Sequence, residues 1–411
     1  MSRIEGIKTY SGNNLDTVFF RPMLTGPSAE QLGVKVMYNM PVPTTLNFWN
    51  RNPDVLRRFT TGKWQGGSST MMYQKKIELS RVKAECSYGA DDYFSTVFEN
   101  ITARADINYG DLTGTELEEA ETALFRAAVA ESIRVSMWYG DTSRSSGFNS
   151  FDGIVKKIIN NHDNDAVHIG YVKDLSDGGV WAERLLNTMW ENSREQLRAL
   201  RSEGNLAFFV TSDIYNAYED SLDNVAIEAA YLDRQNGREG LYYRGIPVVD
   251  LQMNEYKYQV GNLPKSFAIL TDRRNIALAV NTSDFPTSEV RMWYNPDEME
   301  NRQRAVFAAG CEYLLPELMT IAMESEVDVI SSNFDGEKYT IKLGCPESVS
   351  DISYVSLSTY DTKGNVVCDE EEIPMEASTV QTFEYPTTSF SRAIVTICHN
   401  NGYYHKIYLN K

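Results

Sequence analysis

The chain has 411 residues, of which 42% are hydrophobic, and its formal net charge is −18. That length predicts two or three packed domains with a sizeable buried core. The acidic excess argues against a protein whose main task is to grip phosphate backbones. The sequence has neither a run of roughly 20 apolar residues nor an apolar signal-peptide core, so we expect a soluble protein that folds in the cytosol.

The first 55 residues predict an extended arm, because Gly, Pro and Asn recur along them and interrupt every helical period. The aromatic content of this arm is too high for plain disorder, so we expect it to dock on its own body or on a neighbour. Residues 1–110 carry 13 Lys+Arg and 10 Asp+Glu, a net +3, which leaves −21 for the other 301 residues. This contrast favours a basic arm that laps over the acidic body of an identical copy, while a solvated surface explains the same numbers.

A flexible tip and a two-stranded hairpin are predicted within 56–110. Gly62, Gly66 and Gly67 mark the tip. The run YQKKIELSRVKAECSY then alternates apolar and charged positions, with a break in phase near Ser80. The pattern predicts a protruding hairpin with a bulge, which is marginally stable alone and needs another surface to lie on.

The clearest helix is predicted over 113–140. It opens with a capping box from Thr115 to Glu118 and ends at Gly140. An α-helix rises about 1.5 Å per residue, so roughly 25 residues make a rod about 40 Å long.

Short buried strands alternate with helices over 150–280, which predicts a mixed α/β domain. A second helix is expected from about Gly179 to Glu203, a buried strand at LAFFV, and a short helix at RRNIALAV. After these, AVFAAGCEYLL predicts a strand that runs to Pro316.

Beyond about Glu326 the composition changes to short runs rich in β-branched residues, Ser and Tyr. Five runs predict strands: KYTIKLG, SYVSLSTYD, VQTFEY, SRAIVTICH and YYHKIYL. Turn sequences separate them at intervals of about ten residues, which is typical of a small all-β sandwich.

The sequence carries no nucleotide-binding, hydrolase or metalloprotease motif, so we predict no catalytic and no cofactor-binding residue. Five widely spaced cysteines favour reduced structural thiols. Two metal sites are conceivable, a zinc site at Cys398, His399 and His405 and a calcium site at 369–372. Neighbouring strand residues point to opposite faces, and consecutive carboxylates are usually solvated, so no metal is expected.

The order of these elements resembles the Hong Kong 97-type major capsid proteins of tailed bacteriophages. The resemblance is carried by GKWQGGSSTMMYQKKIELSRVK as the extended loop, ELEEAETALFRAAVAESIRVSMWYGD as the spine helix, the short FDGI after it, and the block from NIALAV to AVFAAGCEYLLPELMTIA. It implies an α+β capsid fold, with an N-terminal arm at 1–55, an extended loop and peripheral strands at 56–110, and the spine helix, axial α/β domain and peripheral return at 111–326. The remainder, 327–411, lies outside this core and resembles an added immunoglobulin-like sandwich.

This resemblance implies a structural protein and not an enzyme. Copies would form the hexamers and pentamers of an icosahedral head shell, assembled in the host cytoplasm without a membrane, and packaged DNA would be met only by non-specific proximity. Because the sequence has no charged coiled-coil prefix, a separate scaffolding protein or none is implied. A portal and auxiliary capsid proteins are further implied partners, and no cofactor is implied.

The predicted contacts between subunits lie on the extended loop: Lys63, Trp64, Lys75, Lys76 and Arg81. We expect them to touch acidic and apolar surface of an adjacent copy, because the basic first part of the chain faces an acidic remainder. Many modest contacts of this kind act together once a ring of copies forms.

Three other interpretations are open. An encapsulin-like nanocompartment shell would enclose an enzyme cargo in place of DNA, and a tail sheath or tube protein would form helical filaments. A cell-surface carbohydrate-binding or hydrolytic protein with a β-sandwich appendage is a different class, and the sequence has no signal peptide or recognisable pair of catalytic carboxylates to support it.

Overall fold

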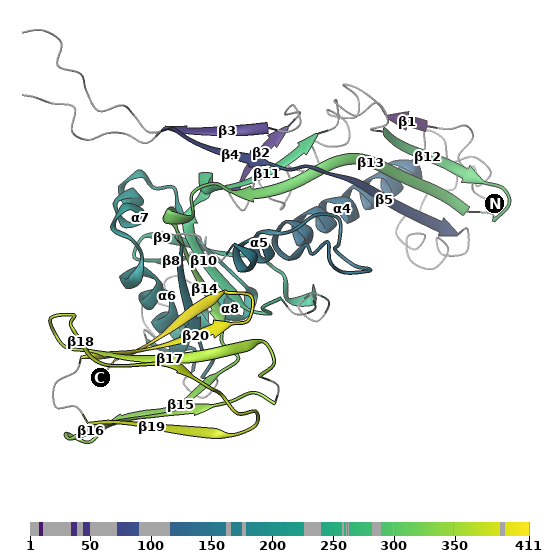
Figure 1. Ribbon diagram of the computed structural model, residues 1–411. Coiled ribbons are helices and arrows are strands. Elements are labelled where there is room, and N and C mark those ends of the chain that lie inside the picture. The colour runs from purple at the N-terminus through teal and green to yellow at the C-terminus, as the bar shows by residue number, and fades with distance from the viewer. Residues whose placement is uncertain are drawn as a thin grey trace, which may run out of the picture. The chain divides into compact units, whose positions relative to one another are not determined.

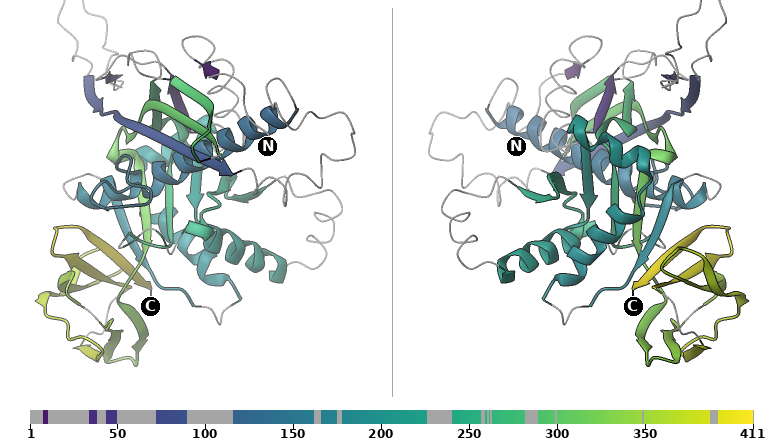
Figure 2. Two further views of the ribbon diagram at one scale, coloured as in Figure 1. Left: turned by 90° about the vertical axis from the view of Figure 1, so that its right-hand side faces the viewer. Right: turned by 90° about the vertical axis from the view of Figure 1, so that its left-hand side faces the viewer.

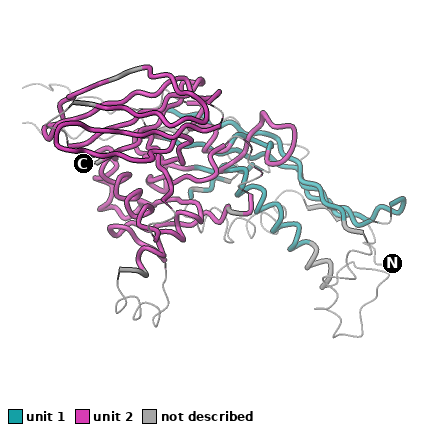
Figure 3. Tube along the Cα trace, turned by 90° about the horizontal axis from the view of Figure 1, so that it is seen from below, with its two compact units in different colours: residues 1–137, 149–152, 277–314 teal, residues 138–148, 153–276, 315–411 magenta. Residues whose placement is uncertain are grey.

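The computed structural model divides the chain into two compact units (Figure 3). Unit 1 comprises residues 1–137, 149–152 and 277–314, and unit 2 comprises residues 138–148, 153–276 and 315–411. The residues that the structure describes are 8–10, 34–38, 44–49, 72–89, 116–161, 166–174, 178–225, 240–256, 259, 261, 263–281, 289–298, 300–347, 349–386 and 391–410. Within these ranges, none of the helices is long and apolar enough to span a bilayer.

Unit 1 is built on a six-stranded sheet with the order β1-β12-β13-β11-β2, in which β5 also pairs with β13 (Figure 1). Strand β13 is the predicted AVFAAGCEYLL strand, extended to 14 residues. It pairs with β5 without a register shift from Ser80 opposite Ala309 to Gly89 opposite Glu300. The strands are β1 (Lys8–Tyr10), β2 (Lys35–Tyr38), β5 (Ser80–Gly89), β11 (Ile276–Asn281), β12 (Glu289–Asn295) and β13 (Glu300–Tyr313).

The predicted hairpin is wrong in its pairing. Strand β4 (Met72–Ile77) pairs with β3 (Thr44–Trp49), whereas β5 pairs with β13. At the break between β4 and β5 the chain crosses β13 so closely that a Cβ added to Gly310 would lie 2.3 Å from the carbonyl oxygen of Glu78. A long partner strand satisfies more backbone groups than an isolated two-stranded hairpin, which is why the long-range pairing prevails.

Helix α4 (Glu116–Tyr139) is the long helix predicted at 113–140. Its 24 residues make a rod of about 36 Å. In unit 1 the hydroxyl of Thr122 donates to Sδ of Met292 on β12, at 3.5 Å. Buried apolar residues recur on α4 at helical spacing: Phe125, Val129, Ile133, Val135 and Met137. The predicted capping residue Thr115 lies outside the described residues.

Unit 2 contains a ten-stranded sheet in the order β18-β17-β20-β21-β6-β14-β10-β7-β9-β8. Its second half is the predicted α/β part, with the LAFFV strand as β7 fully buried. The strands of this half are β6 (Val167–Tyr171), β7 (Leu206–Val210), β8 (Leu241–Tyr243), β9 (Ile246–Asp250), β10 (Phe267–Asp272) and β14 (Met319–Glu324).

Buried side chains pack on both faces of this half of the sheet. Phe208 and Val210 pack in one cluster with buried residues of α6 (Val180–Asn192) and α8 (Ser212–Val225). Phe209 points the other way, 5.6 Å between ring centroids from Trp138 at the end of α4. The remaining helices of unit 2 are α5 (Ile154–Asn160), α7 (Glu195–Ala199) and the 3₁₀ helices η2 (Leu200–Glu203), η3 (Asn254–Tyr256), η4 (Arg273–Asn275) and η5 (Pro316–Leu318).

The helix predicted from Gly179 to Glu203 is interrupted at Ser193, whose ψ of 150° is extended. The side chain of Ser193 donates to the carbonyl of Trp190 at 2.7 Å, and that of Asn192 donates to the carbonyl of Thr188 at 2.9 Å. Such local bonds compete with the helical ladder and end it.

The short helix predicted at RRNIALAV is wrong, because only Arg273–Asn275 is helical, as the 3₁₀ helix η4, and the rest is β11. All six residues of β11 are buried, and they lie between β13 and β2 in the sheet. Burial on both faces gives a continuous apolar run with no alternation, which the sequence pattern cannot separate from a buried helix.

The C-terminal part forms two facing sheets (Figures 1 and 2). The order β15-β16-β19 makes one, and β18-β17-β20-β21 makes the other. All five predicted strands are present, and the structure adds β15 and β18. The strands are β15 (Asp328–Phe334), β16 (Lys338–Gly344), β17 (Ile352–Tyr360), β18 (Val366–Ile373), β19 (Val380–Pro386), β20 (Arg392–His399) and β21 (Tyr404–Asn410). Tyr339, Ile341 and Leu343 of β16 share one core with Val355 and Val395 of the facing sheet.

The larger C-terminal sheet is continuous with the α/β sheet, because β21 pairs in parallel with β6 through Lys406 and Ile169. This pairing places 327–411 in the same compact unit as 153–276. The predicted boundaries after residues 55, 110 and 326 stay predictions.

Candidate assembly surfaces and a polar cavity

The three described residues of the predicted loop contact do not share one environment. Lys75 lies against its own chain, with Nζ 3.6 Å from Oε1 of Glu312 and 4.6 Å from the ring centroid of Tyr313. Lys76 points to the opposite face of β4, is 54% exposed and pairs with Glu78 at 3.4 Å. Lys75 is therefore held within its own subunit, whereas Lys76 is available to a neighbour.

Arg81 is exposed at the start of β5, opposite Ala308 of β13. Lys63 and Trp64 lie outside the described residues. The prediction that these five residues form one intersubunit contact stays a prediction.

The pairing of β5, β13 and β12 places further cations on the face that carries Arg81, because side chains two residues apart point the same way. Arg304 lies opposite Arg291 of β12 and also opposite Glu85 of β5. Arg302 lies opposite Trp293, and the guanidinium of Arg304 is 5.8 Å from the ring centroid of Trp293. We call this surface the basic sheet face: Arg81, Lys83, Arg291, Trp293, Arg302 and Arg304.

Carboxylates accompany the cations of the basic sheet face and pair with some of them. Lys83 pairs with Glu85 at 2.7 Å, and both side chains are more than half exposed. Arg302 pairs with Glu298 and lies 3.7 Å from Glu300. Exposed pairs of this kind contribute roughly 0 to 1 kcal/mol and exchange readily for other partners. The basic sheet face is therefore a mixed surface, in which cations outnumber the carboxylates that pair with them.

Sequence reasoning missed the residues of β12 and β13 on this face. The spacing of Arg302 and Arg304, and of Arg291 and Trp293, is the i, i+2 spacing of one strand face, and it is present in the sequence. What could not be read was that the two segments pair with each other and with β5.

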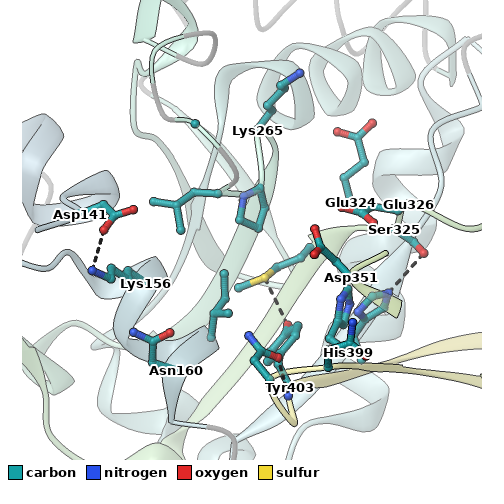
Figure 4. A pocket seen from close by; sticks show the side chains of 18 of the residues that line it. Asp141, Lys156, Asn160, Lys265, Glu324, Ser325, Glu326, Asp351, His399 and Tyr403 are labelled. Atoms are coloured by element: carbon teal, nitrogen blue, oxygen red, sulfur yellow. Dashed lines mark hydrogen bonds and ion pairs between the residues drawn. The ribbon is translucent and has the colours of Figure 1, made fainter. Parts of the chain in front are cut away.

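A second candidate site is a polar cavity of about 780 Å³ inside unit 2 (Figure 4). The ion pair of Lys156 with Asp141, at 2.6 Å, lies on one side. His399 and Asp351 lie on the other. The lining residues are Asp141, Ser143, Lys156, Ile159, Asn160, Gly261, Leu263, Pro264, Lys265, Met323, Glu324, Ser325, Glu326, Asp351, His399, Asn400, Asn401, Tyr403 and His405.

Charge is balanced on the Asp141 side of the cavity. Partial burial works to raise the pKa of Asp141, but hydrogen bonds from Lys156 and Ser143 outweigh it and hold this pKa below its usual value. The carboxylate is therefore ionised at neutral pH and fixed by its partners.

The histidine side differs, because burial lowers the pKa of His405 to about 3 and that of His168 on β6 to about 4. His399 also has a pKa below its usual value, chiefly through burial, with Glu326 and Asp351 acting in the opposite direction. All three rings are therefore neutral at pH 7.

The conceivable zinc site gains no support from the geometry, and the conceivable calcium site at 369–372 includes side chains outside the described residues. His399 and His405 do come together, with ring centroids 5.4 Å apart. Across the described part of the chain, however, no group of three or more His, Cys, Asp or Glu side chains could hold a metal ion.

Searches with family models and among curated proteins match nothing. The chain is similar to solved structures of viral and related particles. The satellite phage P4 procapsid structure, which includes the size determination (Sid) protein, contains a chain 10% identical to this one, with 74% of this chain and 96% of that chain covered and a TM-score of 0.44. The capsid of a native GTA particle contains a chain that is 11% identical, with 72% of this chain and 90% of that chain covered and a TM-score of 0.41. The capsid of the cyanophage P-SCSP1u contains a chain that is 10% identical, with 71% of this chain and 86% of that chain covered and a TM-score of 0.39. These three are capsid structures.

Proposed function

We propose that the chain is the major capsid protein of a tailed bacteriophage, a structural protein without catalytic activity. Copies of it would assemble as hexamers and pentamers into the icosahedral head shell, with the Hong Kong 97-type fold. A scaffolding protein, a portal and auxiliary capsid proteins are its proposed partners, and packaged DNA is met only by proximity. The shell would assemble in the host cytoplasm.

The observation that carries this proposal is the basic sheet face. A chain of net charge −18 gathers five cations and Trp293 on one side of a three-strand ladder, with Glu85, Glu298 and Glu300 paired among them. Identical copies that expose one cationic surface and an acidic remainder attract each other, and the attraction fixes which surfaces meet. A monomeric enzyme needs no such surface, whereas a shell built from hundreds of contacts does.

Incomplete burial of β5 supports the same conclusion. The side of β5 opposite to Arg81 carries Val82, Ala84 and Cys86, and each of them is only half-buried within its own chain. Apolar residues on a paired strand normally lie under a helix or a second sheet. A neighbouring copy that covers this side would bury them.

The C-terminal sandwich is proposed to be immunoglobulin-like and exposed on the exterior of the shell. Two facing sheets of three and four strands support this assignment. Residues 327–411 contain 6 Lys+Arg and 12 Asp+Glu, so the net charge of this part is −6. An acidic outer domain keeps finished shells apart in solution.

Charge reversal tests the proposed contact at the loop. The double substitution Lys76→Glu with Arg81→Glu removes two exposed cations from β4 and β5, so we expect assembled particles to fall by about tenfold or more at low salt. Particles are counted by electron microscopy, and folding is checked by circular dichroism.

Lys338→Glu is the matched control, because Lys338 is 53% exposed on the C-terminal sandwich and pairs with Glu384. We expect it to leave assembly unchanged. Lys75→Glu is made separately, because its contacts with Glu312 and Tyr313 predict a lower melting temperature as well. Normal assembly of the double variant would contradict the proposed contact.

A further inference from the structure

The C-terminal sandwich is joined to the α/β sheet by a narrow junction. Lys406 and Ile169 are the residue pair through which β21 and β6 are in register. The ring of His405 lies directly on Gly170 of β6, so closely that an added Cβ there would be 2.3 Å from Cδ2 of that ring. We call this junction the seam, defined as β6, β21 and the end of β20.

Three of the four histidines in the chain meet at the seam, each from a different strand. His168 comes from β6, His399 from β20 and His405 from β21. The rings of His399 and His405 are 5.4 Å apart, and His168 packs edge-on to Tyr403 with ring centroids 5.2 Å apart. Protonation of more than one ring would place like charges beside each other in a buried site.

The hydrogen bonds around His405 suit a neutral ring. Nε2 lies 3.2 Å from the hydroxyl of Ser325, and the buried Nδ1 has no hydrogen-bond partner among the described residues. A protonated ring carries a donor on both nitrogens, so one N–H would stay unsatisfied unless the site opened to water.

The charged and titratable groups around the three rings do not supply a counterion for His405. Glu326 and Asp351 act on His399, whereas Glu324 of β14 is bound to Lys173 at 2.8 Å. The charges that act on His405 are those of His399 and His168, and both oppose its protonation. Other titratable groups on the packed elements include Tyr171 of β6, Cys398 of β20, and Tyr404, Lys406 and Tyr408 of β21. Tyr403 precedes β21, and Asp141, Lys156 and Lys265 lie on the cavity wall.

The polar cavity supplies a route for protons, because His399 and His405 both line it beside exposed Asn400 and Asn401. A buried cluster of neutral histidines beside a polar cavity can take up protons only by breaking its own packing.

We propose that the seam is an acid-sensitive release point, where mild acid detaches the C-terminal sandwich from the α/β sheet while each part keeps its own fold. The direction of the pH effect depends on which state binds more protons. The folded seam holds histidine pKa values of about 3 and 4, below the ordinary 6.5, so the released state binds more protons. The seam is fully stable above pH 6.5 and weakens as the pH falls from there toward 4.

The test is hydrogen exchange of the full chain followed by mass spectrometry between about pH 7.5 and pH 5, with rates corrected for their intrinsic pH dependence. Amides at the seam, around Ile169 of β6 and Lys406 of β21, are expected to lose protection by about tenfold or more, while β7 and β16 keep theirs. The experiment needs no assembled particle, so its outcome is independent of the proposed shell function.

Two substitutions make the test specific. His405→Phe keeps a ring on Gly170 but removes its proton site, so the loss of protection is expected at lower pH. Tyr403→Phe is the matched control, because it removes a hydroxyl bond to Met323, 3.2 Å long, without changing a group that titrates in this range. Its pH dependence is expected to match the unsubstituted chain.

Equal protection of β6 and β21 at both pH values would overturn the proposal. So would a simultaneous loss in β7, or an unshifted pH dependence in folded His405→Phe. If circular dichroism shows that His405→Phe does not fold at neutral pH, His399→Gln at the cavity edge replaces it under the same criteria.

Discussion

Gly179 is a residue at which the fold leaves no room for a side chain. It precedes α6 with φ of +92°, in the left-handed region, and a Cβ there would lie 2.1 Å from the carbonyl oxygen of Ala217 on α8. That oxygen belongs to the backbone and cannot move without shifting the helix. The sequence indicates a helix start at this glycine, but the contact with α8 depends on tertiary packing.

Gly179→Ala is expected to lower the free energy of unfolding by about 3 kcal/mol or more, because it adds a steric clash to an unfavourable φ. Gly204→Ala is the matched control. Gly204 has φ of +73° and open space around its Cβ position, so this change is expected to cost about 1 kcal/mol. Urea unfolding followed by circular dichroism measures both, and equal losses would show that the contact with Ala217 is unimportant.

At the scale of elements, alternation in the sequence predicts half-buried strands but not the strands with which they pair. The five predicted C-terminal strands are correct because one face of each is solvated. The sequence of β11 predicts a helix because burial on both faces leaves no alternation of apolar and polar residues. The prediction of a hairpin is wrong because β5 pairs with β13, far along the chain. A local sequence pattern does not indicate such a pairing.

Strand β18 (Val366–Ile373) is an edge strand whose sequence protects it. Val366 is 55% exposed, yet acidic residues occupy 369–372 and two register shifts interrupt the pairing with β17. Charges and bulges on an edge discourage pairing with a second molecule. The position of the acidic run on an edge strand therefore gives it a structural role.

Removal of one charge tests this protective role. Asp369→Val extends the exposed apolar run of β18, so concentration-dependent aggregation is expected to increase. Glu347→Val is the matched control, because it makes the same charge change at an exposed position outside the strands. Light scattering at increasing protein concentration distinguishes the two, and identical curves would argue against edge protection by Asp369.

At the scale of the whole molecule, the long helix, the α/β sheet, the long strand β13 and the sandwich could all be predicted from composition and pattern. The candidate assembly surface could be predicted only in part. The charge of the loop predicts Arg81, whereas Arg291 and Arg304 share a face with it through strand register alone. The continuity of the sheet through β6 and β21 likewise depends on a contact between distant segments.

Electron microscopy of the purified full chain, with a mass measurement by light scattering on the same sample, tests the central claim most directly. We predict closed shells, or rings of five and six copies, since each copy carries complementary surfaces that close under symmetry. Small shells that enclose an enzyme would indicate a nanocompartment. Helical filaments would contradict the account and indicate a tail protein, and a monomer that persists at high concentration with a scaffolding protein present would contradict it as well.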